Sequence, residues 1–316
     1  MKPAIKAAMK AVLFRRYGGP EVLEYAELPV PVPAAGEALV EVRACSVNPV
    51  DWKLRAGLLQ KFFPLEFPAV CGRDGAGVVA ALEGDAQGFA VGDEVCFIAA
   101  RGQGCCAERI AIRTERLARK PARIDFAQAA AFPLAGVTAW IAIAEAGAVA
   151  RGMNVLVHAG AGGVGGMAIQ IARHLGASVV ATCSAANADY VRGLGASAVS
   201  AYDREDFTAL GPVFDVVFDS VGGEVHRRSY EVLKKGGTLV YVVAQPIEDL
   251  SSRYGVTTRP AVVRDDPAVL REVAALVDSG ALVPQVGMTL PFAQAGEAQR
   301  ISASGHARGK IVLMRD

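Results

Sequence analysis

A glycine-rich stretch in the middle of the chain restricts the possible folds more than any other feature. Between Val155 and Ala177 the sequence reads VLVHAGAGGVGGMAIQIARHLGA, in which an apolar run leads into the spacing G-x-G-x-x-G, from Gly160 to Gly165. An apolar strand, a glycine turn and a helix in this order are typical of a nucleotide-binding α/β unit. The first glycine makes the turn, the second lets backbone approach a pyrophosphate, and the third lets the helix pack on the sheet.

The start of this helix is suited to binding phosphate. Free backbone N–H groups and a partial positive charge are found at a helix N-terminus, and both attract anions. The sequence therefore predicts a dinucleotide whose pyrophosphate lies against the turn. The residues expected to hold it are Gly160, Ala161, Gly162, Gly163 and Val164. A tight turn without any ligand is the alternative.

The end of the next strand bears on which dinucleotide is bound. An NAD site places a carboxylate there for the ribose 2′-hydroxyl, but no acidic residue occurs from Val179 to Ala188. A carboxylate about 4 Å from a 2′-phosphate would repel it by about 4 kcal/mol per charge pair at an effective dielectric constant of about 20. The sequence therefore favours NADPH, with Ser184, Asn187 and Tyr202 as donors to the phosphate. Ser184 is equally well explained as a helix N-cap.

Length, charge and cysteine content set the broad class of the protein. The 316 residues are enough for two domains. With 33 basic and 32 acidic residues the net charge is +1, which gives no reason to expect nucleic acid or a membrane surface as a partner. No apolar run approaches the roughly 20 residues that span a bilayer. The six cysteines have no zinc-ligand spacing, so the reducing cytoplasm is the expected location.

The character of the sequence changes near Asp125. Residues 10–120 are short alternating runs between Gly- and Pro-rich turns, which predict β structure. From Asp125 onward strands alternate with helices, which predicts a doubly wound parallel sheet. We therefore expect an α/β protein with two domains. A β-rich domain is expected from residues 1–125 and 265–316, and a Rossmann-type domain from residues 126–264.

The same patterns predict individual elements of the second half. Asp125 is expected to cap the helix FAQAAAF. The expected strands are 153–158, 179–182, 213–219, 238–243 and 257–263, and the expected helices are 164–175, 188–194 and 224–235. Pro260 has no N–H for a sheet ladder, so the strand 257–263 should lie at a sheet edge. A helix and a terminal strand after Asp265 are expected to return to the β-rich domain.

Six motifs in sequence order resemble one family of enzymes. They are ACSVNPVDWKLRAG, GAGVVAALEGDAQGFAVGDEV, AAFPLAGVTAW, VLVHAGAGGVGGMAIQIARHLGA, FDVVFDSVGG and GHARGKIVL, and they extend over about residues 9–316. The chain resembles the medium-chain dehydrogenase/reductase superfamily, in its zinc-independent quinone oxidoreductase (zeta-crystallin-like) and alkenal reductase branch.

This resemblance implies a GroES-like catalytic domain and a Rossmann domain, with the active site in the cleft between them. It also implies NADPH as the hydride donor. Dimers of the family commonly pair an edge strand of each Rossmann domain, so a homodimer through the strand that contains Pro260 is expected.

The zinc alcohol dehydrogenases of the same superfamily are a rival interpretation. By the resemblance, Asn48 stands where their first Cys ligand would be and Arg73 where the His would be. FPLAG supplies no third ligand, and CFIAARGQGCCAERIAI lacks a four-cysteine spacing. Zinc needs thiolate, imidazole or carboxylate ligands, so we expect no metal.

Without a metal, hydrogen-bond donors must polarise the acceptor, which suits a quinone or an α,β-unsaturated carbonyl. The resemblance places this chemistry in CSVNPVDWKLRAG. Asn48 is expected to donate its amide to the substrate or the nicotinamide. Asp51 is expected to orient Lys53 or bind a ribose hydroxyl, and Lys53 to act as a donor or proton source. Asn48 is equally a turn residue before Pro49, and Lys53 a solvated lysine. Trp52 stands near where other branch members carry a Tyr.

The resemblance also assigns further cofactor contacts, namely Thr138, Val221, Gly222, Val243, Ala244, Arg308 and Lys310. Val221 and Gly222 should lie against the nicotinamide ribose. Arg308 and Lys310 are expected either to reach the phosphates or to be surface charges. His158, just before the glycine turn, is expected to be a packed, hydrogen-bonded residue.

The function expected from these features is transfer of a hydride from NADPH to a quinone or an α,β-unsaturated carbonyl, a small-molecule electrophile. The alternative is an NADPH-binding sensor or structural protein with little turnover, since a fold does not fix a function.

Overall fold

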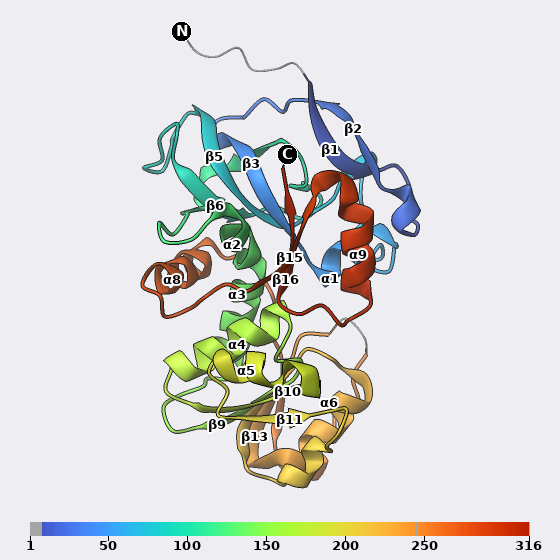
Figure 1. Cartoon of the computed structure of the whole chain (residues 1–316), viewed down its shortest axis with the longest axis vertical. Coiled ribbons are helices and arrows are strands. Elements are labelled where there is room, and N and C mark those ends of the chain that lie inside the picture. Colours follow the sequence, from blue (N-terminus) through green and yellow to red (C-terminus); the bar gives the residue numbers. More distant parts are fainter. Residues whose placement is uncertain (1–7, 244–245, 316) are drawn as a thin grey trace. The chain divides into compact units, whose positions relative to one another are not determined.

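The computed structural model describes residues 8–243 and 246–315, which form two compact units (Figure 1). The first unit holds the chain up to Leu134, residues 265–278 and the chain from Pro284 on. The second holds Ala135–Arg264 and Ser279–Val283. The helix α2 belongs to the first unit, although we placed the domain boundary before it. Its residues pack against strands of that unit, and the backbone N–H of Leu134 donates to the buried carboxylate of Asp74 at 2.9 Å.

The first unit is built on two sheets. The larger sheet has the order β15-β16-β3-β5-β6-β8, with β7 also pairing β3, and the smaller has the order β2-β1-β4. Their strands are β1 (Ala8–Phe14), β2 (Glu24–Pro29), β3 (Glu37–Val47), β4 (Ala69–Val70), β5 (Asp74–Glu83), β6 (Glu94–Ile98), β7 (Arg109–Arg113), β8 (Leu117–Arg119), β15 (Val286–Pro291) and β16 (Lys310–Met314). The terminal strand β16 lies between β15 and β3, so the end of the chain completes this sheet.

Helices accompany these strands. They are α1 (Pro49–Arg55), α2 (Phe126–Ala131), α3 (Pro133–Trp140, which leads into the second unit), α8 (Pro267–Asp278) and α9 (Ala295–Ala303). Asp125 caps α2 as predicted, accepting the Gln128 N–H at 2.8 Å. The expectation that residues 10–120 are all β was wrong at α1, where Asn48 is the N-cap and Pro49 is the first helical residue. Asn followed by Pro is a recognised helix start.

The second unit is a parallel sheet of order β11-β10-β9-β12-β13-β14. Its strands are β9 (Asn154–Val157), β10 (Ser178–Cys183), β11 (Ala198–Ala201), β12 (Phe214–Asp219), β13 (Leu233–Tyr241) and β14 (Thr257–Pro260), and its helices are α4 (Gly163–His174), α5 (Ala188–Gly193), α6 (Gly223–Ser229) and α7 (Ser251–Tyr254). Numbered from β9, the order is 3-2-1-4-5-6, that of a Rossmann fold. Its switch point lies between β9 and β12, where such folds bind ligands.

The boundaries of the elements in this unit differ from the predicted ones mainly after β12. The predicted helix 224–235 ends as α6 at Ser229, followed by a short 3-10 turn. Residues 233–235 instead begin β13, because Leu233 is buried in the core and Lys234 forms an ion pair with Asp215 of β12 at 2.7 Å. The strand β14 lies at the sheet edge, as expected from Pro260, its last residue.

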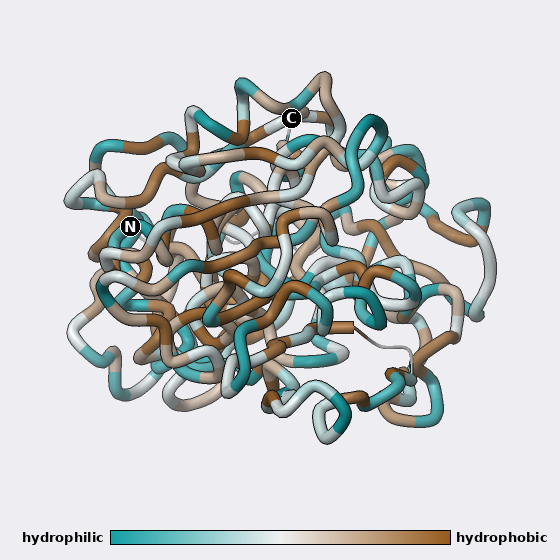
Figure 2. Tube along the Cα trace, turned by 90° about the horizontal axis from the view of Figure 1, so that it is seen from below, coloured by the Kyte–Doolittle hydropathy of each residue, from teal (hydrophilic) through white to brown (hydrophobic). Residues whose placement is uncertain are grey.

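Each unit has its own apolar core. In the first, side chains of β1, β3, β5, β6 and β7 pack together with Phe292 and the Cys45, Cys71, Cys105 and Cys106 thiols. In the second, residues of β9, β12 and β13 pack around Tyr230 and Phe214. In Figure 2 many inner runs of the trace have hydrophobic colours, and hydrophilic colours are frequent at its outer turns. Of the helices that the structure describes, none is long and apolar enough to cross a membrane.

Candidate active site

The glycine turn joins β9 to α4, as its sequence predicts. Gly162 is the N-cap of α4, and no side chain caps this helix end. An N-terminus without a side-chain cap leaves backbone N–H groups of the first turn available to another acceptor. A Cβ placed on Gly162 would meet only the Ala159 carbonyl oxygen, at 3.4 Å, so the backbone here is open on its outer side. Both observations fit a bound pyrophosphate.

The other two motif glycines serve packing. A Cβ on Gly165 would collide with the Ala159 carbonyl oxygen. Because glycine has no side chain, α4 can start this close to the turn. A Cβ on Gly160 would approach Ala181 of β10 at 2.8 Å and Ile169 of α4 at 3.1 Å. The left-handed residue of the turn is Ala159, with φ of +53°, and not the first glycine as the motif suggested. The sharp bend is therefore imposed by the surrounding contacts.

His158 ties three elements together beneath the turn. Its Nδ1 lies 3.0 Å from Thr182 Oγ1 at the end of β10, and its Nε2 lies 3.0 Å from Ser229 Oγ on α6. Ser229 donates to the Val225 carbonyl at 2.6 Å, so its oxygen accepts from His158, and the imidazole carries its hydrogen on Nε2. Burial lowers the pKa of His158 to about 4, so the ring is neutral. The prediction of a packed, hydrogen-bonded residue is confirmed.

The end of β10 gathers the residues predicted to face a 2′-phosphate. Asn187 Nδ2 donates to Ser184 Oγ at 3.0 Å, and Tyr202 is exposed at the end of β11. The adjacent strand β11 also supplies a carboxylate here, because Asp203 accepts the Ala185 N–H at 2.8 Å. Sequence reasoning named Tyr202 as a phosphate donor but searched for a carboxylate only at residues 179–188, and therefore missed Asp203. The pairing of β10 with β11, Cys183 opposite Ala201, is the signal that would have found it.

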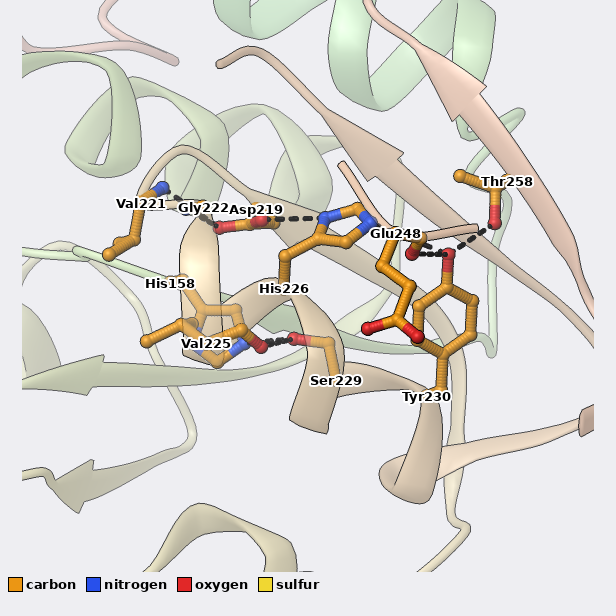
Figure 3. Close-up of polar contacts among 10 residues, drawn as sticks. All are labelled: His158, Asp219, Val221, Gly222, Val225, His226, Ser229, Tyr230, Glu248 and Thr258. Atoms are coloured by element: carbon orange, nitrogen blue, oxygen red, sulfur yellow. Dashed lines mark hydrogen bonds and ion pairs between the residues drawn. The ribbon is translucent and has the colours of Figure 1, made fainter. Parts of the chain in front are cut away.

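The turn after β12 is held by a buried carboxylate. Asp219, the last residue of β12, is fully buried and accepts the N–H groups of Val221 at 2.8 Å and Gly222 at 2.9 Å (Figure 3). Gly222 has φ of +84°, a left-handed conformation that favours glycine. The side chain of Val221 is exposed. This turn can therefore offer a nicotinamide ribose a side chain and carbonyls, while both N–H groups are committed to Asp219.

A buried polar cluster lies in the first unit, around Asn48. The Asn48 Nδ2 donates to Asp74 Oδ1 at 2.7 Å and lies 3.4 Å from the Ser46 carbonyl oxygen, and Ser46 Oγ donates to the same Asp74 oxygen. The Asn48 Oδ1 accepts from Lys310 Nζ at 2.6 Å. We expected Asn48 to donate to a substrate, but its amide is used on both sides within the protein. Its side chain therefore acts as a buried bridge.

Lys310 belongs to this cluster as well. It is buried, and besides Asn48 its ammonium donates to the Val47 carbonyl at 3.0 Å. Burial lowers the pKa of Lys310, while the charges of Asp74 and Asp51 oppose that shift. We expected Lys310 to reach a cofactor phosphate or the surface. The observed contacts instead join β16 to the end of β3, so the candidate catalytic segment depends on a strand from near the end of the chain.

Asp51 has a partner that the sequence did not suggest. It is buried at the first turn of α1, and its Oδ2 accepts the Asn48 N–H at 2.7 Å. Its role is to cap the helix, where we expected it to orient Lys53 or bind a ribose. Burial raises the pKa of Asp51 to about 7, and the nearby charge of Asp74 acts in the same direction, while Lys310 lowers it.

Lys53 and Trp52 follow on the same helix. The Lys53 ammonium lies 5.4 Å from the centre of the Trp52 ring, and burial lowers the pKa of this lysine. The Trp52 indole Nε1 is buried and has no hydrogen-bond partner among the described residues. A buried donor without a partner is costly in a protein. A bound molecule would reach this N–H only after the side chain or its neighbours move.

The remaining predicted residues are distributed over both units. Thr138 is buried on α3, and Val243 follows β13, where it contacts the position a Gly222 Cβ would occupy. Ala244 lies outside the described residues. Arg308 is exposed and precedes β16. For Thr138 and Val243, burial and contacts alone do not identify a cofactor atom as the partner.

Arg73, which the resemblance places at the position of a zinc ligand, makes structural contacts instead. Arg73 is buried, donates to the Ala99 carbonyl at 3.2 Å and forms an ion pair with Asp265 at 2.7 Å. Across residues 8–243 and 246–315, no group of three or more His, Cys, Asp or Glu side chains is arranged to hold a metal ion. The six cysteines are buried and free.

A β-rich unit with a buried polar cluster and a parallel sheet with an uncapped glycine turn define a two-domain, nucleotide-binding class of protein. Two family descriptions match this chain, "Alcohol dehydrogenase GroES-like domain" over residues 34–151 and "Zinc-binding dehydrogenase" over residues 194–313.

Relatives extend over almost the whole chain. A chloroplast envelope quinone oxidoreductase homolog of Arabidopsis thaliana is 30% identical, covering 96% of this chain and 98% of the relative. An NADPH-dependent alkenal/one oxidoreductase of the same plant is 35% identical, covering 98% and 80%. The solved structure of a mycobacterial protein complexed with NADPH is 30% identical with a TM-score of 0.85, covering 97% and 99%.

The chain therefore belongs to the medium-chain dehydrogenase/reductase superfamily. This is a family of oxidoreductases, and the relatives named above use NAD(P)H or act on quinones or alkenals according to their names.

Proposed function

We propose that this protein is an NADPH-dependent reductase of quinones or α,β-unsaturated carbonyls that works without a metal. The single observation that carries the proposal is the N-terminus of α4, which is free of a side-chain cap beside a glycine whose outer side is open. The names of the relatives support the reaction class.

The residues around the Rossmann sheet fit the dinucleotide. The first turn of α4 would hold the pyrophosphate through its N–H groups. Ser184, Asn187 and Tyr202 would hold the 2′-phosphate as neutral donors. Asp203 is a carboxylate near that place, but its oxygen accepts the Ala185 N–H. NADPH, when bound, supplies the hydride.

The residues of the first unit would act on the acceptor. The Trp52 Nε1–H would donate to an oxygen of the quinone or enone, which stabilises negative charge as it develops there. Lys53, with a pKa lowered by burial, would hold the proton that completes the reduction. Asn48, Asp51 and Lys310 would fix the start of α1 rather than touch the substrate.

The protein is further proposed to form a homodimer through β14 and to reside in the reducing cytoplasm. The edge position of β14 and the exposed Val262 just after it support the first statement. The six free, buried cysteines support the second. Small electrophiles, and not nucleic acid or membranes, are the proposed partners.

The experiment follows the absorbance of NADPH and of NADH with purified protein. One reaction contains a bulky ortho-quinone and another a short enone, each with and without a chelator. Oxidation of NADPH, well above that of NADH and unaffected by the chelator, supports the proposal. The better acceptor then identifies the substrate class. Preference for NADH would contradict the proposed cofactor, and Asp203→Asn would then test whether this carboxylate is the cause.

A protein that binds NADPH with little turnover is the second candidate. The observation that favours it is the commitment of the Asn48 amide to Asp74 and Lys310, which removes one expected donor to the substrate. NADPH binding in a calorimeter without oxidation by either acceptor would establish this candidate instead.

A further inference from the structure

The turn at Val221 and Gly222 depends on a buried charge with three donors. Asp219 Oδ1 accepts both backbone N–H groups, and Oδ2 accepts from His226 Nδ1 at 2.9 Å (Figure 3). Burial alone would raise the pKa of Asp219, but the hydrogen bonds from His226 and from the turn hold the pKa below its ordinary value. A buried carboxylate persists only when its oxygens are satisfied. The imidazole is the one side chain among these donors.

His226 is itself fixed from its far side. It is buried on α6, and its ring meets the rings of Tyr230 and Tyr241 edge-on, with centroids 5.6 and 5.4 Å away. Its Nε2 lies 3.4 Å from the Tyr230 hydroxyl, which is 2.9 Å from Thr258 Oγ1 on β14. The imidazole therefore has little freedom to turn, and Nδ1 remains directed at Asp219.

We propose that His226 is a positioning residue, which shapes the turn at Val221 and Gly222 for the cofactor through the carboxylate of Asp219. The proposal rests on the proposed function, in which this turn contacts NADPH. The His226 side chain is buried and reaches the turn through Asp219. The His226 backbone N–H also lies 3.5 Å from the Gly222 carbonyl oxygen, a contact that a side-chain substitution leaves in place. Without its donor, Asp219 Oδ2 is left unsatisfied, and the carboxylate must rotate or take up a proton. Either change weakens the acceptance of the Val221 and Gly222 N–H groups and frees the left-handed backbone of Gly222.

Two substitutions separate this role from simple packing. His226→Asn keeps an N–H at the place of Nδ1, whereas His226→Gln moves its N–H toward the place of Nε2. Both replace the ring by an amide and lose the contacts with Tyr230 and Tyr241, so they are matched in that respect. Tyr230→Phe removes only the hydroxyl that links the His226 Nε2 to Thr258.

The measurement is the Kd for NADPH by calorimetry, together with KM for NADPH and kcat, at a temperature where circular dichroism shows every variant folded. We expect His226→Gln to raise Kd and KM about tenfold, the loss of roughly one hydrogen bond to a charged group. His226→Asn is expected to stay within about threefold of the wild type, and kcat at saturating NADPH to change by less than about threefold in both.

The outcomes distinguish the two proposals. Equal Kd values for His226→Gln and His226→Asn, with the wild type binding NADPH, would overturn the positioning role and leave the proposed function standing. A wild type that does not bind NADPH would overturn the proposed function. If His226→Gln does not fold, Tyr230→Phe provides the test, because loosening the imidazole should raise Kd by about twofold or more. A Kd equal to that of the wild type would then contradict the proposal.

Discussion

At the scale of single residues, the candidate catalytic segment is organised by buried hydrogen bonds rather than by groups that point outward. Asn48, Asp51 and Lys310 all satisfy one another or the neighbouring Asp74. Charges so close together in a buried place perturb one another, and burial together with the nearby charge of Asp74 raises the pKa of Asp51 to about 7. Substitution there should be visible in the pH dependence of unfolding.

The first prediction concerns Asp51→Asn. The folded-state pKa of Asp51, about 7, lies above its ordinary value of 3.8, so between these values the folded protein binds more protons than the unfolded chain. The carboxyl therefore lowers stability progressively as the pH rises through this window. Asn keeps an acceptor for the Asn48 N–H and does not titrate.

The measurement is urea unfolding of wild type and variant at about pH 4.5 and about pH 8. The free energy of unfolding of Asp51→Asn, relative to the wild type, should be larger at the higher pH by about 1–3 kcal/mol. Glu66→Gln, at an exposed position, is the control and should show no such trend. The same difference at both pH values would contradict the assignment.

The second prediction concerns Trp52. Removing its unpartnered N–H by Trp52→Phe should lower kcat/KM for the acceptor about tenfold and leave the Kd for NADPH unchanged, because one hydrogen bond to the acceptor is lost. Trp52→Tyr restores a donor and should recover part of the rate. Steady-state kinetics check this, and equal kcat/KM for Phe and wild type would refute it.

Residues whose roles depend on distant partners were not predictable from the sequence. The glycine turn was predicted because the residues that form it lie within a few positions of the chain. His158 was predicted to be packed because it directly precedes that turn, although its partners Thr182 and Ser229 lie far along the sequence. The contact of Asn48 with Lys310 joins residues 262 positions apart, and Asp203 reaches Ala185 only because β10 and β11 are neighbours. Local spacing carries no information on such pairs.

At the scale of elements, the glycine turn and α4 make one unit with divided tasks. Gly162 faces open space, while Gly165 lies against the Ala159 carbonyl. Gly162 is therefore expected to serve ligand binding and Gly165 to serve folding, although both belong to the same short motif.

The third prediction uses this difference. Gly162→Ala should fold with nearly wild-type stability but bind NADPH at least about tenfold more weakly, because the methyl group occupies the side from which phosphate approaches. Gly165→Ala should lose about 1–3 kcal/mol of stability, because its methyl group collides with backbone. Urea unfolding and NADPH titration measure both. Full NADPH affinity in Gly162→Ala would argue against this phosphate site.

Most elements of the second unit were predictable, because the hydrophobic periodicity and the helix-capping residues indicate the same helices and strands there. The exceptions have physical causes. The helix pattern continues through Lys235, but burial of Leu233 and the pairing of β13 with β12 draw residues 233–235 into the sheet. The helix α1 was missed because β-like segments surround it, although Asn48 and Pro49 mark its start.

At the scale of the whole molecule, the free side of β14 is the surface for which a second copy is proposed. Val262, just after this strand, is 68% exposed and would be covered by a partner chain that pairs with β14. Unpaired edges invite pairing with another chain.

The fourth prediction is that the protein sediments as a dimer of the 32.9 kDa chain and that Val262→Lys shifts it toward the monomer. A buried lysine at an interface carries a desolvation cost that a monomer avoids. Val32→Lys, at a site that is 88% exposed in the other unit, is the control and should leave the sedimentation unchanged. A monomeric wild type at micromolar concentration would refute the proposed dimer.

The position of β16 has a consequence for the order in which the molecule is made. Its pairing partner β3 is synthesised early, but β16 and its Lys310 come at the end. During translation the part of β3 that pairs with β16 stays unpaired, and Asn48 lacks its contact with Lys310 until β16 has been made. The glycine turn has been made before that point. A chain truncated before this strand would therefore contain the whole parallel sheet of the second unit but an unfinished candidate catalytic segment. Such a chain would be prone to aggregate at this unpaired part of β3.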